Sequence, residues 1–385
     1  MFEIILYISI FLIFYVYLGY PLLLAIWSSL KRKANYSSDH NKLPKISMLI
    51  SAYNEEDVIS DKLENIKEMN YPAHLLEVFI GSDCSDDMTN KLIIESNISN
   101  LRLVAFEERR GKPAVLNDLA KMADGDILVF SDANSMFEPD ALLKLIEPFS
   151  DSTIGGVVGN LSFDMSNIKN SGGLGETLYF KYENIVKRLE SDIYSTIVAN
   201  GAVYVIRKEL YTNIPVTRLV ADDMFIPLSI IQKGFRMFFR RDVYVSESPS
   251  LSVTEEYQKK VRTVASGMEV IKQFHSLLHP KFGFISFALW SHKILRWMVP
   301  FILVSAFVSN LLLINQSPQF QRWLIYQLSF YFSMILGGFL EKQNIKIMPL
   351  QLAYYFIIVN IAIVMGFVKF IRGKEGASWK RTRRK

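Results

Sequence analysis

Four short apolar runs in the first 134 residues each end on side chains that could hold an ion or a phosphate. In chain order these side chains are Tyr53, Asn54 and Glu55; Asp83, Ser85 and Asp87; Arg109, Arg110 and Lys112; and Asp132 and Asn134. Carboxylate and amide oxygens are ligands for Mg²⁺ or Mn²⁺, and a lysine supplies positive charge to phosphate oxygens. The set therefore suits a nucleoside diphosphate bound with a divalent metal. Asp87 fits a helix cap equally well.

The apolar runs themselves predict a parallel β-sheet. They comprise residues 46–53, 76–83, 101–108 and 127–134. The segments between them, of which the first and third have apolar residues at helical spacing, are 55–69, 86–97 and 112–123. This alternation indicates an α/β, Rossmann-like fold with a mostly parallel sheet covered on both faces. Because ligands of such sheets bind beyond the carboxyl ends of the strands, we expect the polar end residues to meet at one edge.

Several other kinds of site are not predicted. Neither G-x-G-x-x-G nor G-x-x-x-x-G-K-[ST] occurs, so a dinucleotide site and a P-loop lack support. The single cysteine, Cys84, excludes an internal disulfide and agrees with a reducing compartment. Residues 31–282 lack the aromatic and arginine pattern of an RNA-binding module, so we expect no nucleic-acid partner.

Part of the chain is expected to lie in a membrane. Of 385 residues, 50% are hydrophobic, and the mean hydropathy of +0.19 is high for a soluble protein. Charged residues are missing from four stretches, residues 4–30, 297–321, 323–340 and 347–368. Each is long enough, or nearly so, to cross a hydrocarbon core of about 30 Å. The predicted transmembrane helices lie in residues 1–30 and, within 298–371, near residues 298–315, 322–340 and 348–370.

Basic residues beside these segments predict the side of the membrane. Lys31, Arg32 and Lys33 directly follow the first segment, and the positive-inside rule then places the middle of the chain in the cytoplasm. The basic tail, residues 372–385, favours the same side and contact with anionic lipid headgroups. The sequence thus predicts a multi-pass plasma-membrane protein with a cytoplasmic domain and membrane lipids as partners.

The number of C-terminal crossings is ambiguous. One crossing before the cytoplasmic domain and three after it would put the basic tail outside. Residues 283–299 mix aromatic residues with His292, Lys293 and Arg296, and they suit an interfacial helix better than a crossing. Either one candidate crossing is re-entrant, or residues 283–315 cross more than once.

Five stretches resemble, in order and spacing, the motifs of inverting family 2 glycosyltransferases. They are SAYNEE, GSDCSDDMT, RRGKPAVLN, FSDANSMFEPDAL and ADDMFIPLSIIQKGFR. The most similar members are membrane-integrated and related to poly-N-acetylglucosamine, hyaluronan and cellulose synthases. The resemblance covers roughly residues 45–270. It implies a GT-A domain over residues 45–250, followed by amphipathic or interfacial helices over 251–297.

The resemblance assigns the first group of residues to a UDP-sugar donor. Tyr53 and Glu55 would lie against the uracil and the ribose, and Asp83 would meet the uracil edge. Lys112 would approach the diphosphate. For Tyr53 and Lys112 the alternatives are packing at a strand end and a solvated helix N-terminus.

The resemblance also implies a metal site. Asp132 would be the first acid of a DxD-like motif that binds the metal and the diphosphate, and Asn134 stands where the second acid is usual. Because an amide oxygen brings no charge, we expect a weaker Mg²⁺ or Mn²⁺ site that the nucleotide's phosphates complete. Asn117, in the same motif as Lys112, could simply brace its loop.

A pair of acids before a predicted helix supplies the candidate catalytic base. The family carries an acidic triplet eleven residues before a Gly-aromatic-Arg, and counting back from Gly234 reaches Asp223. An inverting transferase needs one carboxylate to deprotonate the acceptor hydroxyl as it attacks the anomeric carbon. The neighbouring Asp222, which we expect to be a substrate-binding residue, could raise the pKa of Asp223 through its like charge. The alternative is that both aspartates only cap the helix.

The last motif departs from the family pattern. Membrane synthases carry QxxRW, which holds the nucleotide and the acceptor at the membrane face. Here Arg262 fits the arginine, but Thr263 replaces the tryptophan and Gln258 comes one residue too early. A basic amphipathic helix at a membrane surface would look similar. The departure weakens the prediction of processive polymerisation more than that of sugar transfer.

The resemblance therefore implies transfer of a sugar from a UDP-sugar, with UDP-N-acetylglucosamine suggested by the nearest relatives. The acceptor would be a growing polysaccharide or a lipid-linked sugar, and secretion or polymer-export partners are possible. The alternative is a non-processive enzyme that adds one sugar to a lipid carrier or glycolipid. A different class would be a catalytically inactive nucleotide-binding membrane scaffold. Polar residues of the predicted crossings, Asn310, Gln327 and Asn360, fit either a sugar channel or bonds between helices.

Overall fold

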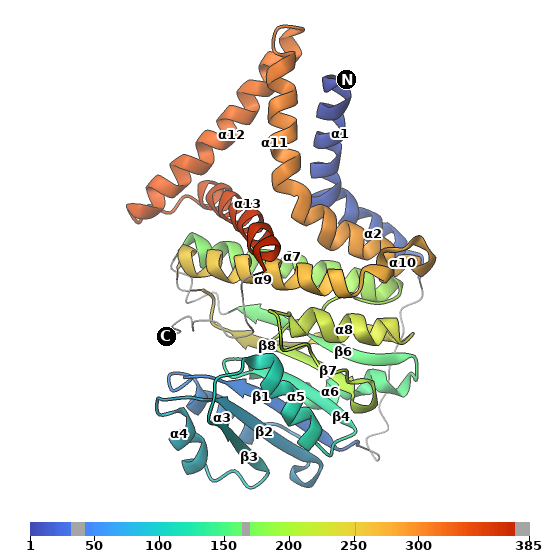
Figure 1. Ribbon diagram of the computed structural model, residues 1–385, viewed down its shortest axis with the longest axis vertical. Coiled ribbons are helices and arrows are strands. Elements are labelled where there is room, and N and C mark those ends of the chain that lie inside the picture. The colour runs from blue at the N-terminus through green and yellow to red at the C-terminus, as the bar shows by residue number, and fades with distance from the viewer. Residues whose placement is uncertain (32–42, 164–169, 251, 374–385) are drawn as a thin grey trace.

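The protein is arranged in three layers (Figure 1). A computed structural model describes residues 1–31, 43–163, 170–250 and 252–373. A mixed α/β domain forms the first layer, two long helices lie across it as the second, and apolar helices form the third.

One eight-stranded sheet carries the α/β domain, in the order β3-β2-β1-β4-β7-β6-β8-β5. The strands are β1 (Ile46–Ala52), β2 (Leu76–Asp83), β3 (Leu101–Phe106), β4 (Ile127–Asp132), β5 (Met136–Phe137), β6 (Ile154–Phe163), β7 (Val203–Arg207) and β8 (Arg236–Glu247). The first four strands of this order are parallel, whereas β7 is antiparallel to both β4 and β6. The predicted α/β fold and its four parallel strands are confirmed. The sequence reading missed β6 and β8, which extend the sheet beyond β7.

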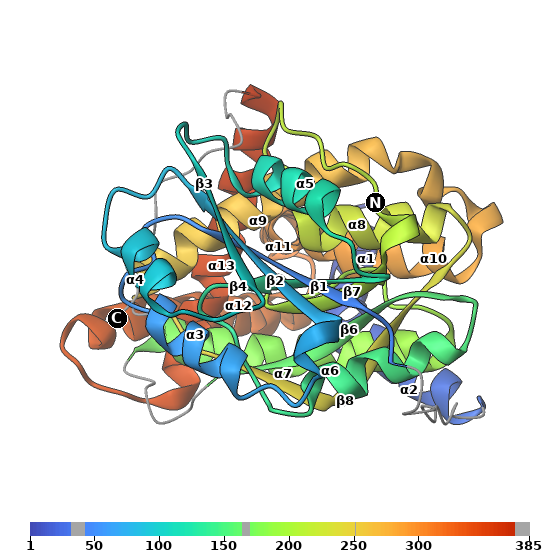
Figure 2. The ribbon, with the colours of Figure 1, turned by 90° about the horizontal axis from the view of Figure 1, so that it is seen from below.

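Helices cover both faces of the sheet, as Figure 2 shows. They are α3 (Ile59–Lys67), α4 (Thr89–Glu95), α5 (Lys112–Met122), α6 (Ala141–Ile146) and α8 (Asp222–Gln232), with short 3₁₀ turns at Ala73–Leu75, Glu147–Ser150, Lys208–Leu210, His275–Leu278 and Pro280–Phe282. Neighbouring residues of a strand point to opposite faces. Leu49 of β1 therefore packs in the cluster that includes α5 and α8, and Met48 in the one that includes α3 and α6.

The second layer consists of α7 (Ser171–Ile193) and α9 (Val253–Gln273), which contact each other between the sheet and the apolar helices (Figure 1). Both have a side-chain cap: Asn170 accepts a hydrogen bond from the Gly173 amide, and Ser252 from the Glu255 amide. This layer is the floor on which the apolar helices rest.

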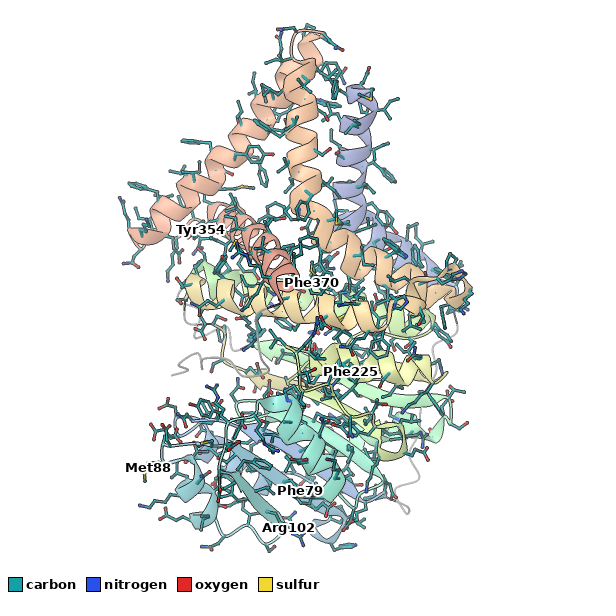
Figure 3. The ribbon with its side chains drawn as sticks, viewed as in Figure 1. Phe79, Met88, Arg102, Phe225, Tyr354 and Phe370 are labelled. Carbon is teal, nitrogen blue, oxygen red and sulfur yellow. The ribbon has the colours of Figure 1, made fainter. Side chains whose placement is uncertain are left out.

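In the part of the chain that the structure describes, four helical segments are long and apolar enough to cross a membrane. The first, Phe2–Ser29, consists of α1 (Phe2–Phe14), a short π-helix (Tyr15–Gly19) and α2 (Tyr20–Ser29). The second, Phe284–Leu313, consists of α10 (Phe284–Ala288), a short π-helix (Leu289–Ile294) and α11 (Leu295–Leu313). The others are α12 (Pro318–Lys342) and α13 (Met348–Arg372). Their outer faces are apolar and exposed, as at Ile8, Val304 and Phe332. In Figure 3 their side chains project outward, whereas Phe225 lies inside, beneath α9. The chain is thus a membrane protein.

The last helix follows a different course from α1 and α11. It runs along α9: the Tyr355 hydroxyl donates to Glu256 at 3.0 Å, and eleven residues later Gly366 lies against Val261 and Val264. A Cβ on Gly366 would come within 2.8 Å of Val264, so only glycine permits this close approach. Figure 1 accordingly shows α13 resting on the second layer, whereas α1 and α11 stand away from it.

Candidate active site

One cavity of about 580 Å³ joins the sheet edge to the apolar helices. Its wall includes every residue to which the resemblance gave a role in catalysis or binding: Tyr53, Glu55, Asp83, Lys112, Asp132, Asn134, Asp222, Asp223 and Arg262. Of the other strand-end residues, Arg109 lines the cavity, whereas Asn54, Ser85, Asp87 and Arg110 are not among its lining residues. The structure therefore brings together residues from β1, β2, β4, α5, α8 and α9, while their individual roles stay predictions. Asn117 is not among the lining residues. Its side chain bonds the Tyr211 hydroxyl and both backbone groups of Ile214, so it braces a loop.

Asp83 organises the turn that precedes Lys112. Its buried carboxylate accepts the Arg110 and Gly111 amides, each at 2.8 Å. Gly111 has φ +89°, a conformation that favours glycine, and α5 begins at the next residue. Asp83 thus holds the loop that aims Lys112, in addition to any contact with a base edge.

Arg109, one of the basic strand-end residues, is a lining residue to which the resemblance gave no role. Its guanidinium carbon lies 3.8 Å from the centre of the Tyr53 ring. A cation over an aromatic face at this distance is attracted by the ring's quadrupole. Arg109 thus covers one face of Tyr53, whose contact with uracil stays a prediction.

Lys112 links the two acidic elements of the site. Its ammonium lies 2.8 Å from Asp132 at the end of β4 and 3.3 Å from Asp222 at the start of α8. Burial lowers the pKa of Lys112, but these two carboxylates outweigh burial and raise the pKa above its usual value. The lysine therefore stays charged. A Cβ on Gly201 would lie 3.4 Å from Asp132 and 3.7 Å from Lys112, so a larger side chain would crowd this pair.

The predicted metal ligands fit a hard cation in part. The Asn134 side chain is buried at the wall of the cavity, and its Oδ1 atom has no hydrogen-bond partner among the described residues. An orphaned buried acceptor is costly unless a ligand satisfies it. Within the described residues, no three or more His, Cys, Asp or Glu side chains gather as a metal site. Asp132 and Asn134 would therefore need phosphate oxygens to complete the coordination of Mg²⁺ or Mn²⁺.

A buried lysine beneath this loop was missed from the sequence. Lys62 of α3 is fully buried, and its ammonium donates to Ser131 Oγ at 2.9 Å and to the Ser135 carbonyl at 2.5 Å. Burial lowers the pKa of Lys62 to about 7. Lys62 follows Ile59 by three residues, so it stands on the apolar stripe of its helix, which was the available signal. It clamps the loop that carries Asp132 and Asn134.

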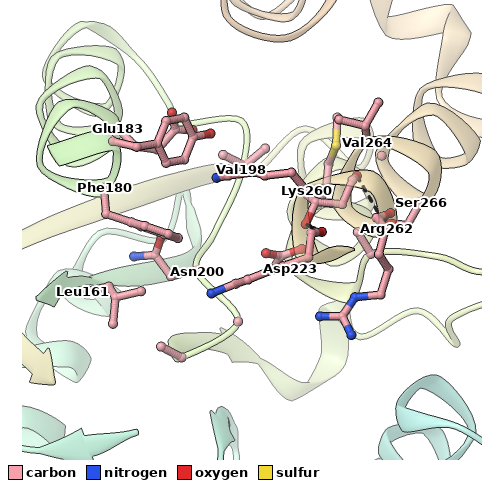
Figure 4. A pocket seen from close by; sticks show the side chains of 18 of the residues that line it. Leu161, Phe180, Glu183, Val198, Asn200, Asp223, Lys260, Arg262, Val264 and Ser266 are labelled. Atoms are coloured by element: carbon pink, nitrogen blue, oxygen red, sulfur yellow. Dashed lines mark hydrogen bonds between the residues drawn. The ribbon is translucent and has the colours of Figure 1, made fainter. Parts of the chain in front are cut away.

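Asp223 has the properties of a general base. Burial and the neighbouring Asp222 raise the pKa of Asp223 to about 6, against the opposing effect of nearby lysines. Its backbone carbonyl accepts the Ala199 amide at 2.7 Å, and this bond holds the start of α8 against the cavity. Figure 4 shows Asp223 and Arg262 among the side chains that line this cavity. A carboxylate with this pKa is ionised at neutral pH and can accept a proton.

Comparison with known proteins agrees with this geometry. Residues 44–266 match the family described as "Glycosyltransferase like family 2". Poly-beta-1,6-N-acetyl-D-glucosamine synthase of Staphylococcus epidermidis is 23% identical over 370 residues, covering 89% of this chain and 88% of that protein. The synthase of the same name from Staphylococcus aureus strain MSSA476 is 26% identical over 262 residues, covering 66% of this chain and 61% of that protein.

A solved structure matches nearly the whole chain. It is the mannosyltransferase PcManGT from Pyrobaculum calidifontis in complex with GDP-Man and Mn²⁺, with a TM-score of 0.76 and 22% identity over 97% of this chain and 100% of that one. The predicted GT-A fold is thereby confirmed. Since the family match spans more than half of the sequence, the resemblance is confirmed too, and the chain belongs to glycosyltransferase family 2.

Proposed function

We propose that the protein is an inverting enzyme that moves a sugar from a UDP-sugar to an acceptor at the cytoplasmic face of the plasma membrane. Glycosyl transfer itself follows from the family. The observation that carries the finer proposal is the Lys112 bridge between Asp132 and Asp222, with Asp223 on the wall of the same cavity. In this cavity the cation Lys112 suits a leaving diphosphate, and the carboxylate of Asp223 suits a general base.

Each residue then has one task. Tyr53 and Arg109 hold the base of the nucleotide, and Lys112 places positive charge beside the leaving diphosphate. Asp223 accepts the proton of the acceptor hydroxyl as that oxygen attacks the anomeric carbon. Asp132 and Asn134 would hold Mg²⁺ or Mn²⁺, and the bound ion would stabilise negative charge on the diphosphate.

Two kinds of acceptor are supported by different observations. The names of the staphylococcal relatives favour a growing polysaccharide. Single addition is favoured by Thr263, which stands in place of the usual tryptophan. It is also favoured by the polar residues of the apolar helices: Asn310 lies 2.8 Å from Gln327 of α12, and Asn360 donates to the Phe356 carbonyl of its own helix. These amides are thus used in bonds within and between helices, which supports no sugar channel.

A screen of UDP release tests the transferase proposal. Purified full-length protein in detergent, supplied with Mg²⁺ or Mn²⁺, should release UDP from one nucleotide sugar, with UDP-N-acetylglucosamine tested first. Sizing the product on a gel distinguishes a polymer from a single addition. UDP binding without turnover of any nucleotide sugar would instead indicate an inactive scaffold.

The course of the apolar helices supports three crossings, by α1, α11 and α12. At the end of α12, Glu341 accepts hydrogen bonds from the amide and the hydroxyl of Ser171, so the chain returns to the second layer. From there α13 runs along α9 of the second layer, and its Tyr355 hydroxyl donates to the buried Glu256 of α9. An in-plane α13 keeps the basic tail on the cytoplasmic side, as its charge favours. The tail itself lies outside the described residues.

Single cysteines in a Cys84→Ser background test this topology. We expect Gln316→Cys, between α11 and α12, to react with an impermeant maleimide on intact cells. Asn344→Cys and Gly373→Cys, before and after α13, should react only after permeabilisation. Labelling of Asn344→Cys and Gly373→Cys from opposite sides would show that α13 crosses.

A further inference from the structure

The membrane end of the cavity combines cations with apolar side chains. Its cations are Lys187, Lys259, Lys260, Arg262, Lys293 and Arg296. Its apolar wall comes from Tyr17 at the N-terminal helix, Trp297 of α11, and Phe356, Val359 and Ile363 of α13. A neutral sugar needs neither feature. A molecule with an anionic head and an apolar chain would use both.

Arg296 is the cation whose hydrogen-bonding capacity is least used. Its guanidinium is buried, and Nη1 donates to Glu183 at 2.7 Å. The Nε and Nη2 atoms are buried without a hydrogen bond of good geometry, and the guanidinium carbon lies 5.9 and 5.2 Å from the centres of the Tyr179 and Tyr182 rings. Because burying an incompletely satisfied charged donor is costly, these atoms of a cavity-lining side chain point to a ligand.

Neighbouring groups leave a surplus of positive charge at this place. Glu183 is shared by Arg296, by Lys293 at 3.1 Å and by His292 at 2.7 Å. His292 also contacts Glu190 at 2.7 Å, and Tyr20 donates to the same carboxylate. A single carboxylate, that of Glu183, therefore faces two cations, Lys293 and Arg296. One further anion would balance the remaining positive charge.

Three other cations of this end have partners of their own. Lys259 pairs with Glu176, and Lys260 lies 3.5 Å from Glu256. Lys187 donates to the Ala199 carbonyl at 3.0 Å. The unsatisfied donors are thus those of Arg296, beside the apolar wall of α11 and α13.

We propose, building on the transferase function above, that this end binds the phosphate of a lipid-linked sugar acceptor. Arg296 and Lys293 contact the phosphate, and the apolar chain lies against Trp297 and Val359. The acceptor's sugar hydroxyl then faces Asp223. In the transfer, the hydroxyl oxygen forms a bond to the anomeric carbon while the bond from that carbon to UDP breaks. The bonding pair leaves with UDP, and the hydroxyl proton passes to Asp223.

The groups of the cavity wall match such an acceptor. The wall includes the candidate base Asp223, cations such as Lys293 and Arg296, and apolar side chains of the membrane helices. A lipid-linked sugar presents a hydroxyl, then a phosphate, then a chain. A growing polysaccharide of neutral sugars would leave Nε and Nη2 of Arg296 without a partner. An in-plane α13 would let the chain lie at the membrane surface beside Ile363.

Binding of radiolabelled farnesyl phosphate to the full-length protein in detergent tests the site. We expect Arg296→Gln to weaken binding by about tenfold or more, because a charge-assisted contact is lost. Val359→Trp, which fills the apolar end and leaves the charges intact, should weaken binding comparably. The matched control is Arg322→Gln, at an exposed arginine of α12 that does not line the cavity, and its binding should be unchanged.

Competitors decide which part of the probe is recognised. Farnesol and inorganic phosphate at equal concentration should not displace farnesyl phosphate. Displacement by farnesol would overturn the role of the phosphate, and displacement by inorganic phosphate would overturn that of the chain. Equal displacement by phosphatidic acid would assign the site to a membrane phospholipid headgroup and overturn the acceptor.

A transfer assay separates this inference from the function on which it rests. With farnesyl phosphate that carries one N-acetylglucosamine, labelled sugar from the donor should enter the organic phase. UDP release without labelled lipid would overturn the acceptor and leave the transferase intact. Failure to release UDP from any nucleotide sugar would overturn the transferase itself.

Discussion

The two ends of the cavity are built in different ways. At the sheet end, the contacting residues lie in motifs that the sequence shows: Asp83 holds the Arg110 amide, and Lys112 meets Asp132 and, much further along the chain, Asp222. At the membrane end, Glu183 meets Arg296 across 113 residues. The sheet end can therefore be recognised from short sequence motifs, whereas the membrane end depends on how the helices pack. We expect substitutions at the first to change chemistry, and those at the second to change stability and acceptor binding.

The largest effect is expected at the catalytic base. Asp223→Asn removes the proton acceptor, and transfer should fall by about 10³-fold or more, with UDP affinity nearly unchanged. Steady-state UDP release and equilibrium UDP binding measure the two quantities. Asp61→Asn, at an exposed aspartate of α3, is the matched control. An Asp223→Asn enzyme with half the normal rate would refute the base assignment.

At the membrane end, we expect substitutions to lower the free energy of unfolding. Burial raises the pKa of Glu183, but His292, Lys293 and Arg296 outweigh burial and hold it well below its usual value. Glu183→Gln leaves these groups without their carboxylate and should cost about 3 kcal/mol or more of unfolding free energy. Unfolding in detergent, with Glu64→Gln on the surface as control, measures the loss. A stability change as small as the control's would show that the network is not structural.

Lys112 tests whether the sheet end acts through charge. Lys112→Met removes the cation between Asp132 and Asp222, so kcat/KM for the nucleotide sugar should fall by about 10²-fold. The exposed Lys67→Met serves as control. Lys112→Arg should recover part of the activity, because it restores the charge. Equal losses in the methionine and arginine variants would mean that shape, rather than charge, governs this position.

The pH dependence of transfer sharpens the assignment of Asp223. Its carboxylate must be ionised to accept a proton, and its pKa is about 6. Below pH 6, kcat/KM should therefore fall by about tenfold per pH unit, and above pH 6 this group should impose no limit. Asp222→Asn removes a like charge that raises the pKa, so the acid limb should move to lower pH. An unmoved limb in that variant would contradict the coupling.

The smallest effect concerns the metal. Asn134→Asp adds a charged ligand beside Asp132, so the Mg²⁺ or Mn²⁺ concentration for half-maximal rate should fall a few-fold with activity retained. Titration of UDP release with each metal measures it. If Asp132→Ala left metal-dependent transfer unchanged, these two residues would not be the metal site.

The parts predicted correctly are those with a local signature. Strand β4 and Asp132 were found because a buried apolar run stops where a carboxylate begins. The same reading missed Lys62, because a lysine is expected at a surface even when it stands on an apolar stripe. It also gave Glu183 no role and took Arg296 only as a sign of an interfacial helix, since neither lies in a motif.

The sequence by itself determined the α/β domain, the acidic and basic groups at its strand ends, and the segments apolar enough for a membrane. Periodicity and strand ends are properties of neighbouring residues, so they can be read along the chain. The tertiary structure alone decided that α13 runs along α9 and that Arg296 lies buried beside Glu183. The burial and pairing of a charge, and the orientation of a helix relative to the second layer, depend on partners distant in sequence. The reason is that tertiary packing determines which surfaces are removed from water.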